Sequence, residues 1–169
     1  MGTRGRGAFK VSITKEDLVF AAAHFITFAG HRCEKLHGHN YRASLFVEGR
    51  LETDSWFVVD FSAVKKIMRA LTAELDHRVL LPRDNPKLAI SQQNGSVHVA
   101  FAGEPRYVFP AGDCVILPIP NTTVEMLAQY LAGRVHAELG SSGAHLRTIE
   151  VEVEENFGQS ASYRETLDD

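Results

Sequence analysis

Two amphipathic helical patterns, each set among segments of strand-like character, constrain the fold of this 169-residue chain more than any other feature. Apolar residues recur at three- and four-residue spacing over residues 61–75 and 124–135, which is typical of helices with one buried face. Four other segments are expected to be extended: residues 9–26 with a bend around 14–17, 40–47, 149–155 and 160–164. With an inserted hairpin, the order is strand, strand, helix, hairpin, helix, strand, strand, which predicts one α+β domain.

Capping residues mark where the two helices begin. Asp60 or Ser62 is expected to cap the first helix, which ends near Asp76 and His77. Thr122 is followed three residues later by Glu125, the spacing of a capping box, and this predicts the start of the second helix. A glycine- and serine-rich stretch at residues 140–143 ends that helix.

The connection between the helices is long enough to carry structure of its own. Alternating apolar residues on either side of Gly103 and Glu104 predict an inserted hairpin within about residues 84–113. Residues 1–7 hold three glycines and two arginines without periodicity, so a disordered N-terminus is expected there. The remaining residues, 8–169, are expected to form the single domain.

Composition excludes several classes of protein. Apolar residues make up 44% and charged residues 23%, values close to those of globular chains, which argues against a disordered chain or a coiled coil. The net charge of −3 lacks the basic excess of a nucleic-acid binder. The longest apolar stretch, residues 18–30, is too short to span a bilayer. No secretory leader is expected, and the two cysteines, Cys33 and Cys114, predict a cytoplasmic protein with free thiols.

Three of the eight histidines have the spacing of a metal site. His37 and His39 lie two residues apart in a predicted strand, so their side chains point to the same face. If the extended segment that holds His24 pairs antiparallel with that strand, three imidazoles meet on one surface. Three protein ligands leave the fourth position of a zinc ion open, as in catalytic sites. The alternatives are a surface pair at His37 and His39, a hydrogen-bonded core histidine at His24, and an inert thiol at Cys33.

Two further groups have a chemical and a structural interpretation. Asp76 beside His77 can orient the imidazole and raise its basicity for acid–base catalysis. Alternatively, Asp76 is solvated and His77 interacts favourably with the C-terminus of the helix. Glu155 is in phase with the buried residues of its strand, where a carboxylate needs a donor. Alternatively, the strand ends at Glu154 and the phase no longer applies.

In this order and spacing, the motifs together resemble the 6-pyruvoyltetrahydropterin synthase family, including its bacterial 6-carboxytetrahydropterin synthase branch. The resemblance runs from about residue 20 to residue 164. It is carried by the segment 20–24, Cys33 with the run His37-Gly38-His39-Asn40-Tyr41, the segments 59–61, 75–77 and 122–125, and Val151-x-Val153-x-Glu155 with Tyr163.

The resemblance implies a tunnelling fold, in which a four-stranded antiparallel sheet carries two helices on one face. Three subunits of that family close into a barrel and two barrels stack into a hexamer, with active sites between subunits. The resemblance also implies roles for individual residues. Zinc would bind at His24, His37 and His39; Cys33 would match the catalytic base, Asp76 and His77 the proton relay, and Glu155 the carboxylate that anchors the pterin ring. Thr123 and Glu125 match a segment that helps hold the pterin, although the capping box explains them equally well.

The spacing between Cys33 and His37 distinguishes the branches of this family. Three residues separate them here, as in the carboxy enzymes, whereas the pyruvoyl enzymes commonly have five. This implies conversion of 7,8-dihydroneopterin triphosphate to 6-carboxy-5,6,7,8-tetrahydropterin, acetaldehyde and triphosphate, as in deazapurine (queuosine-type) pathways. The insertion and Asn156, where threonine is common, depart from the family pattern. The alternatives are 6-pyruvoyltetrahydropterin synthase, a non-catalytic pterin-binding oligomer, and a three-histidine zinc hydrolase with a dispensable Cys33.

Overall fold

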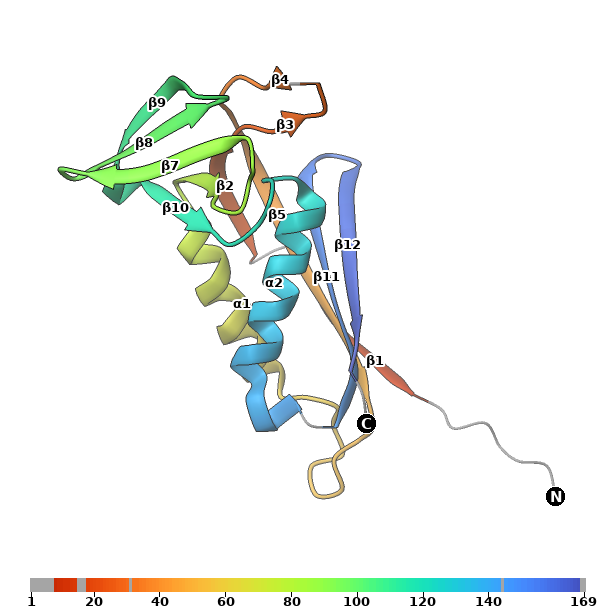
Figure 1. Cartoon of the computed structure of the whole chain (residues 1–169). Coiled ribbons are helices and arrows are strands. Elements are labelled where there is room, and N and C mark those ends of the chain that lie inside the picture. The colour runs from red at the N-terminus through yellow and green to blue at the C-terminus, as the bar shows by residue number, and fades with distance from the viewer. Residues whose placement is uncertain (1–7, 15–17, 31, 144, 168–169) are drawn as a thin grey trace.

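A long, twisted sheet with two helices on one face forms the body of the molecule (Figure 1). The structure is a computed structural model and describes residues 8–14, 18–30, 32–143 and 145–167. The expected disordered segment 1–7 and most of the expected bend at 14–17 lie outside these ranges. The strands of the main sheet, in spatial order, are β10 (Cys114–Leu117), β6 (Arg78–Pro82), β2 (Val19–His24), β5 (His37–Gly49), β11 (Leu146–Asn156) and β12 (Gln159–Thr166).

The antiparallel part of this sheet matches the prediction. Strand β1 (Phe9–Ile13) and strand β2 pair with successive halves of β5, which pairs in turn with β11, and β11 with β12. The four-stranded antiparallel sheet is nevertheless an incomplete description, because β6 and β10 add parallel strands beside β2. Both strands are short apolar runs without alternation, and such runs give no clear strand signal. The sheet is therefore mixed.

Helices α1 (Phe61–Leu75) and α2 (Val124–Leu139) cover one face of the sheet (Figure 1). Asp60 caps α1 as predicted, because its side chain accepts a hydrogen bond of 2.8 Å from the Ser62 backbone N–H. The expected capping box of α2 is wrong by one residue: Thr123, and not Thr122, is the N-cap and accepts from the Met126 N–H. The main core lies between the sheet and the helices; its largest fully buried side chains include Phe20, Tyr41, Leu45, Met68 and Leu131.

The insertion is a three-stranded antiparallel sheet and not the two-stranded hairpin that the sequence predicted. The hairpin consists of β8 (Ser96–Phe101) and β9 (Glu104–Pro110), and β7 (Leu88–Gln93) adds a third strand. Strand β7 escaped prediction because its second half is polar, which hides the alternation. One face of this small sheet packs on a second core with Phe25 and Leu81. Beside it, β3 (Thr27–Phe28) and β4 (Arg32–Cys33) form a short pair, and the 3₁₀ turns η2 (Ala111–Asp113) and η3 (Gly140–Gly143) complete the chain.

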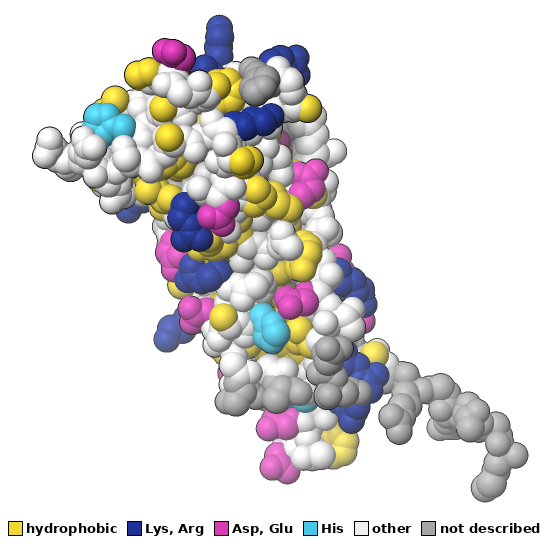
Figure 2. All heavy atoms as spheres, viewed as in Figure 1, with side chains coloured by type: hydrophobic (Ala, Val, Ile, Leu, Met, Phe, Trp, Pro, Cys, Tyr) yellow, Lys and Arg dark blue, Asp and Glu magenta, His cyan; other side chains and the backbone are white. Residues whose placement is uncertain are grey.

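Charges of both signs are interspersed on the face shown in Figure 2, which carries no extended patch of one sign. Within the described ranges, no helix is both long enough and apolar enough to cross a membrane.

Candidate active site

Three histidines and one glutamate from three adjacent strands converge at one end of the sheet. The antiparallel pairing of β2 with β5 places His24 directly opposite His37, as the sequence predicted, and His39 follows on the same face. The ring centroids lie 4.7 Å apart for His24 and His37 and 4.8 Å apart for His37 and His39. Glu155 of β11 joins them, so that one ligand atom of each of the four residues lies within 4.8 Å of the others.

His24 is fully buried and its tautomer is determined by the backbone. Its Nδ1 lies 2.9 Å from the Thr122 carbonyl oxygen, which can only accept, so Nδ1 carries the proton and Nε2 carries the lone pair. Burial lowers the pKa of His24, and the two neighbouring imidazoles act in the same direction, although Thr122 and Glu155 oppose them. The neutral imidazole is the form that binds a metal ion.

The other two histidines bring further ligand nitrogens to the cluster. His37 Nδ1 donates to the Lys35 carbonyl at 2.9 Å, which leaves Nε2 as its ligand nitrogen. Glu155 Oε1 lies 3.1 Å from His24 Nε2 and 3.3 Å from His39 Nε2, and both nitrogens are buried without a hydrogen-bond partner in the described part of the chain. His24 Nε2, with its lone pair, and the Glu155 carboxylate are both acceptors, and they repel unless a cation lies between them. The donor set therefore fits a metal ion, and the cluster could hold one.

A β-bulge positions Glu155. The pairing of β11 with β12 shifts register between Glu154 and Asn156, and Glu155 is the extra residue. Its carboxylate is 19% exposed and accepts a hydrogen bond of 3.5 Å from the buried Tyr41 hydroxyl. Glu155 lies on the side of β11 that faces the histidines, as its phase suggested, and the alternative that the strand ends at Glu154 is wrong, because β11 continues to Asn156. The neighbouring Glu154 is 8% exposed and accepts a hydrogen bond from the Gly158 N–H.

Cys33 lies on β4, outside the histidine–glutamate cluster, and is half-buried. Its thiol donates weakly to the Glu34 carbonyl at 3.6 Å. Burial raises the pKa of the Cys33 thiol, the Arg106 guanidinium lowers it and the Glu34 carboxylate raises it. The structure therefore places this predicted base on the segment that leads to His37, beside a cation.

Asp76 and His77 form the predicted pair, with 2.9 Å between a carboxylate oxygen and His77 Nδ1. The pair lies along β2, where Asp76 accepts from the Ala21 N–H at 2.8 Å, and not within the cluster. That backbone hydrogen bond, followed by the one from His77, lowers the pKa of Asp76. The His77 side chain is 82% exposed, and its backbone has a left-handed φ of 56°.

Thr123 and Glu125 lie at the start of α2 and are not part of the cluster. The Thr123 hydroxyl caps the helix, and the exposed Glu125 carboxylate sits in the first turn, where the helix dipole favours negative charge.

The residues that orient His24 were not predicted. Thr122 is fully buried, and besides receiving the His24 hydrogen bond it donates from its hydroxyl to the Phe25 carbonyl at 3.0 Å. Asn121 braces the same loop, because its amide accepts from the Thr27 N–H and donates to the Thr27 carbonyl. This loop has no periodicity, so its sequence shows that a turn precedes the helix but not which strand it contacts.

A pocket of about 440 Å³ opens beside the cluster. His39 and Glu155 line it from the cluster side, and Asn40, Arg42 and Phe157 line it from the sheet end. The Arg42 guanidinium lies 4.5 Å from the centre of the Phe157 ring. A planar molecule with polar edges could therefore enter next to the candidate metal ligands.

Comparisons with known proteins give the class to which this fold and site belong. Residues 12–166 match the family model described as 6-pyruvoyl tetrahydropterin synthase, and the chain belongs to this family. A Bacillus subtilis relative named 6-carboxy-5,6,7,8-tetrahydropterin synthase is 27% identical over 150 residues, covering 88% of this chain and 82% of the relative. A Methanocaldococcus jannaschii relative that carries this name provisionally is 34% identical over 152 residues, covering 89% and 92%.

A solved structure extends the likeness to the fold. The 6-pyruvoyltetrahydropterin synthase of Plasmodium vivax, in a variant with a catalytic glutamate replaced by alanine, superposes with a TM-score of 0.87 at 29% identity. The alignment covers 96% of this chain and all of the Plasmodium chain. The mixed sheet with two helices is therefore the fold of this family.

Proposed function

We propose that this protein is a zinc-dependent 6-carboxy-5,6,7,8-tetrahydropterin synthase that acts on 7,8-dihydroneopterin triphosphate and releases acetaldehyde and triphosphate. The observation that carries the proposal is the cluster of His24, His37, His39 and Glu155, with two buried imidazole nitrogens that lack a hydrogen-bond partner among the described atoms. The names of the relatives and the three-residue spacing between Cys33 and His37 support this branch of the family.

Zinc suits this donor set better than a hard cation does. Three neutral imidazoles are typical ligands of a catalytic zinc ion and leave a position for a substrate oxygen. When bound, zinc supplies a Lewis acid that lowers the pKa of a substrate hydroxyl.

The chain's own residues supply the proton transfers. Cys33 would accept a proton as a thiolate, which the nearby Arg106 guanidinium favours. Asp76 would hold His77 in the tautomer with the proton on Nδ1, so that Nε2 can accept or deliver a proton. Glu155 lines both the cluster and the pocket, from which its carboxylate would hold the guanidine-like edge of the pterin ring.

Product analysis tests this function. Zinc-loaded protein is incubated with 7,8-dihydroneopterin triphosphate, and 6-carboxytetrahydropterin and acetaldehyde are identified by mass spectrometry. His37→Ala serves as the inactive control, since it removes one zinc ligand. Wild-type protein that holds zinc and forms neither product contradicts the proposal.

A second candidate is 6-pyruvoyltetrahydropterin synthase, which eliminates triphosphate and releases no acetaldehyde. The Plasmodium vivax relative carries this name and has a catalytic glutamate. In this chain the Glu34 carboxylate lies 3.9 Å from His37 Nδ1 and accepts from the Ile26 N–H, so a carboxylate is available next to a candidate zinc ligand. The same product analysis separates the two functions, and comparing Cys33→Ala with Glu34→Gln shows which side chain is the base.

A further inference from the structure

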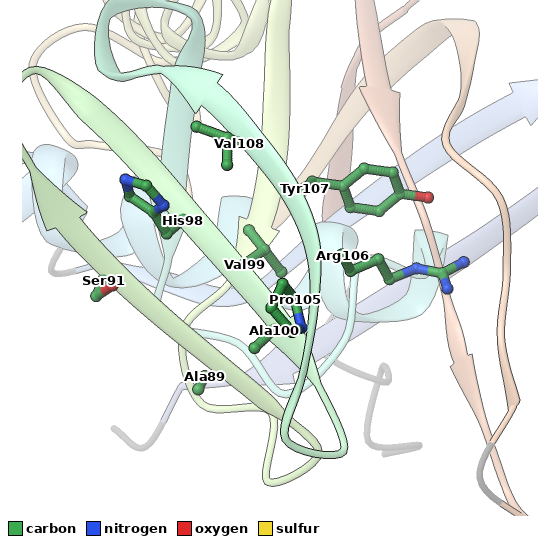
Figure 3. Close-up of a pocket in the computed structure, with 9 residues that line it drawn as sticks. All are labelled: Ala89, Ser91, His98, Val99, Ala100, Pro105, Arg106, Tyr107 and Val108. Atoms are coloured by element: carbon green, nitrogen blue, oxygen red, sulfur yellow. The ribbon is translucent and has the colours of Figure 1, made fainter.

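The inserted sheet contacts the segment that carries Cys33 and leads to His37. Arg106 of β9 donates from Nη2 to the Glu34 carbonyl at 2.7 Å and to the Cys33 carbonyl at 3.3 Å. The neighbouring Tyr107 accepts at its hydroxyl from the Leu36 N–H at 3.1 Å. Figure 3 shows both side chains extending from β9 away from His98 and Ser91, which point to the other side of the insertion.

The local structure of β9 allows two successive residues to reach the same segment. The register between β8 and β9 shifts after Val99, and this leaves Arg106 as the extra residue of a bulge beside Tyr107. The Tyr107 ring packs 5.3 Å from the Phe25 ring, and the Arg106 guanidinium lies 5.2 Å from the centre of the Tyr107 ring. Both side chains are therefore held in place by contacts that do not involve the Cys33 segment.

The contacted segment has little secondary structure of its own. Strand β4 is two residues long and, in the part of the chain that the structure describes, pairs with the two residues of β3 alone; the Glu34 N–H adds one hydrogen bond to the Ile26 carbonyl. An isolated pair of strands of this size is only marginally stable in water. The insertion thus satisfies three backbone groups between Cys33 and Leu36 that β3 does not reach.

We propose that Arg106 and Tyr107 are positioning residues: Arg106 holds the backbone of the predicted base Cys33, and Tyr107 holds the amide that precedes the candidate ligand His37. This inference rests on the proposed function for the roles of Cys33 and His37. It gives the insertion a task in the reaction, namely to keep base and metal ligand at a constant separation.

The charge of Arg106 adds to its hydrogen bonds. Among the described residues, the charged groups that face the Cys33 thiol are Arg106 from β9 and Glu34 from its own segment, and of these two Arg106 favours the thiolate. Removing the guanidinium is therefore expected to raise the pKa of Cys33. Loosening the segment without a loss of charge would instead relieve the burial that raises this pKa, so the two effects have opposite signs.

Arg106→Met tests the first half of the proposal. We expect kcat to fall about tenfold with KM within about twofold, as for other residues that orient catalytic groups. The midpoint of the alkylation rate of Cys33 against pH, followed by peptide mass spectrometry in zinc-loaded protein, should move to higher pH. Arg106→Lys keeps the charge and should recover part of kcat and the wild-type midpoint. The matched control is Arg83→Met, because Arg83 is paired with Asp84 in the same connection and exposed.

Tyr107→Phe tests the second half, because it removes one hydroxyl and keeps the ring on Phe25. We expect zinc to bind about tenfold more weakly in a competition titration with a chelator, since positioning contacts of metal ligands have effects of this size. Tyr130→Phe is the control, since its hydroxyl bonds Arg134 on α2.

The proposal is overturned if Arg106→Met matches Arg83→Met both in alkylation midpoint and, where the protein turns over, in kcat, or if Tyr107→Phe binds zinc as tightly as Tyr130→Phe. Should Arg106→Met fail to fold, Arg106→Lys decides that half: wild-type kcat overturns it, and a loss of about threefold with an unchanged midpoint supports it. Zinc affinity and alkylation need no substrate. A protein that shows no turnover can still show the shifted alkylation midpoint in Arg106→Met and the weaker zinc binding in Tyr107→Phe. That result would contradict the proposed function and leave the positioning roles standing.

Discussion

At the scale of single residues, backbone carbonyls determine how the site can bind a metal ion. The Thr122 and Lys35 carbonyl oxygens each accept a hydrogen bond from Nδ1–H of a histidine, so His24 and His37 present Nε2 to a common point. Glu155 faces the same point with one oxygen and lines the pocket as well. Under the proposed function, metal binding and pterin binding share this side chain, and a substitution at Glu155 is expected to affect both.

The Cys33 side chain is expected to act as a base and not as a zinc ligand, because it lies outside the cluster. Cys33→Ala should keep near-normal zinc content, measured by elemental analysis, while turnover falls at least about a hundredfold, the lower end of what a general base contributes. His37→Ala is the contrasting variant and should lose most of the metal. Loss of zinc in Cys33→Ala would make the cysteine a ligand, and unchanged turnover would favour the hydrolase alternative.

Asp76 gives the protein a pH dependence of stability with a definite sign. Its pKa is lowered from the usual 3.8 by the Ala21 N–H and by His77, so the charged form stabilises the fold above pH 3.8 and this contribution is lost as the pH falls through the lowered value. Asp76→Asn keeps an acceptor for Ala21 but not the charge. We expect a lower Tm than wild type at about pH 7 and a smaller difference at about pH 3, measured by calorimetry. A constant difference at both pH values would show that the charge contributes nothing.

At the scale of secondary structure, periodicity predicted those elements that bury one face against a single neighbour. The alternation of Val151 and Val153 and the helical spacing in α1 and α2 are of this kind. Strands β6 and β10 place apolar side chains in both hydrophobic cores, and β7 is held by pairing with β8, so none of the three strands shows an alternating pattern in the sequence. The bulge at Glu155 depends on a register set between two strands, and no single segment encodes it.

The histidine cluster was predictable for a related reason. His37 and His39 lie in one strand, and only the antiparallel pairing of one further segment was needed to bring His24 to them. Thr122, Asn121, Arg106 and Tyr107 could not be predicted, because they reach the site from loops and an insertion whose placement depends on the whole fold.

Thr123, at the N-terminus of α2, has either a structural or a substrate-binding role, and two substitutions distinguish these roles. Thr123→Ala should lower the free energy of unfolding by about 1 kcal/mol, as for other lost N-caps, measured by urea denaturation. Thr123→Asp supplies a new cap and should recover both stability and turnover. If stability returns in Thr123→Asp but turnover does not, the threonine contacts the substrate.

At the scale of the whole molecule, one chain leaves sheet edges open and keeps the proposed proton relay, Asp76 and His77, apart from the candidate metal site. Strand β12 pairs only with β11 within the described ranges, and an unpaired edge of eight residues invites association. The His77 N–H donates to the Ala21 carbonyl, and Ala21 lies three residues before His24 on β2. His77 and His24 are therefore separated by roughly 10 Å along the strand. With its side chain 82% exposed, His77 is directed to solvent in one copy and is available to a second.

We therefore expect the hexamer that the family resemblance implies. Sedimentation at micromolar concentration should give a mass of about six times the 18.7 kDa of one chain, the dimer of two closed trimers. A single monomeric species under these conditions would contradict the shared site as well as the assembly.

Mixed assemblies test whether the site is completed by a second copy. His37→Ala removes a candidate ligand and His77→Ala removes the relay, so each should be inactive alone. Co-expressed with different tags and purified through both, the two variants should regain up to about a quarter of wild-type activity, because randomly mixed subunits restore that share of sites built from one His37 and a neighbour's His77. The control pairs His37→Ala with Cys33→Ala. These residues lie four positions apart in one chain, so no mixed site holds both and activity should stay absent. No recovery in the first pair would place His77 in the site of its own subunit, and recovery in the control pair would show that Cys33 and His37 of one chain serve different sites.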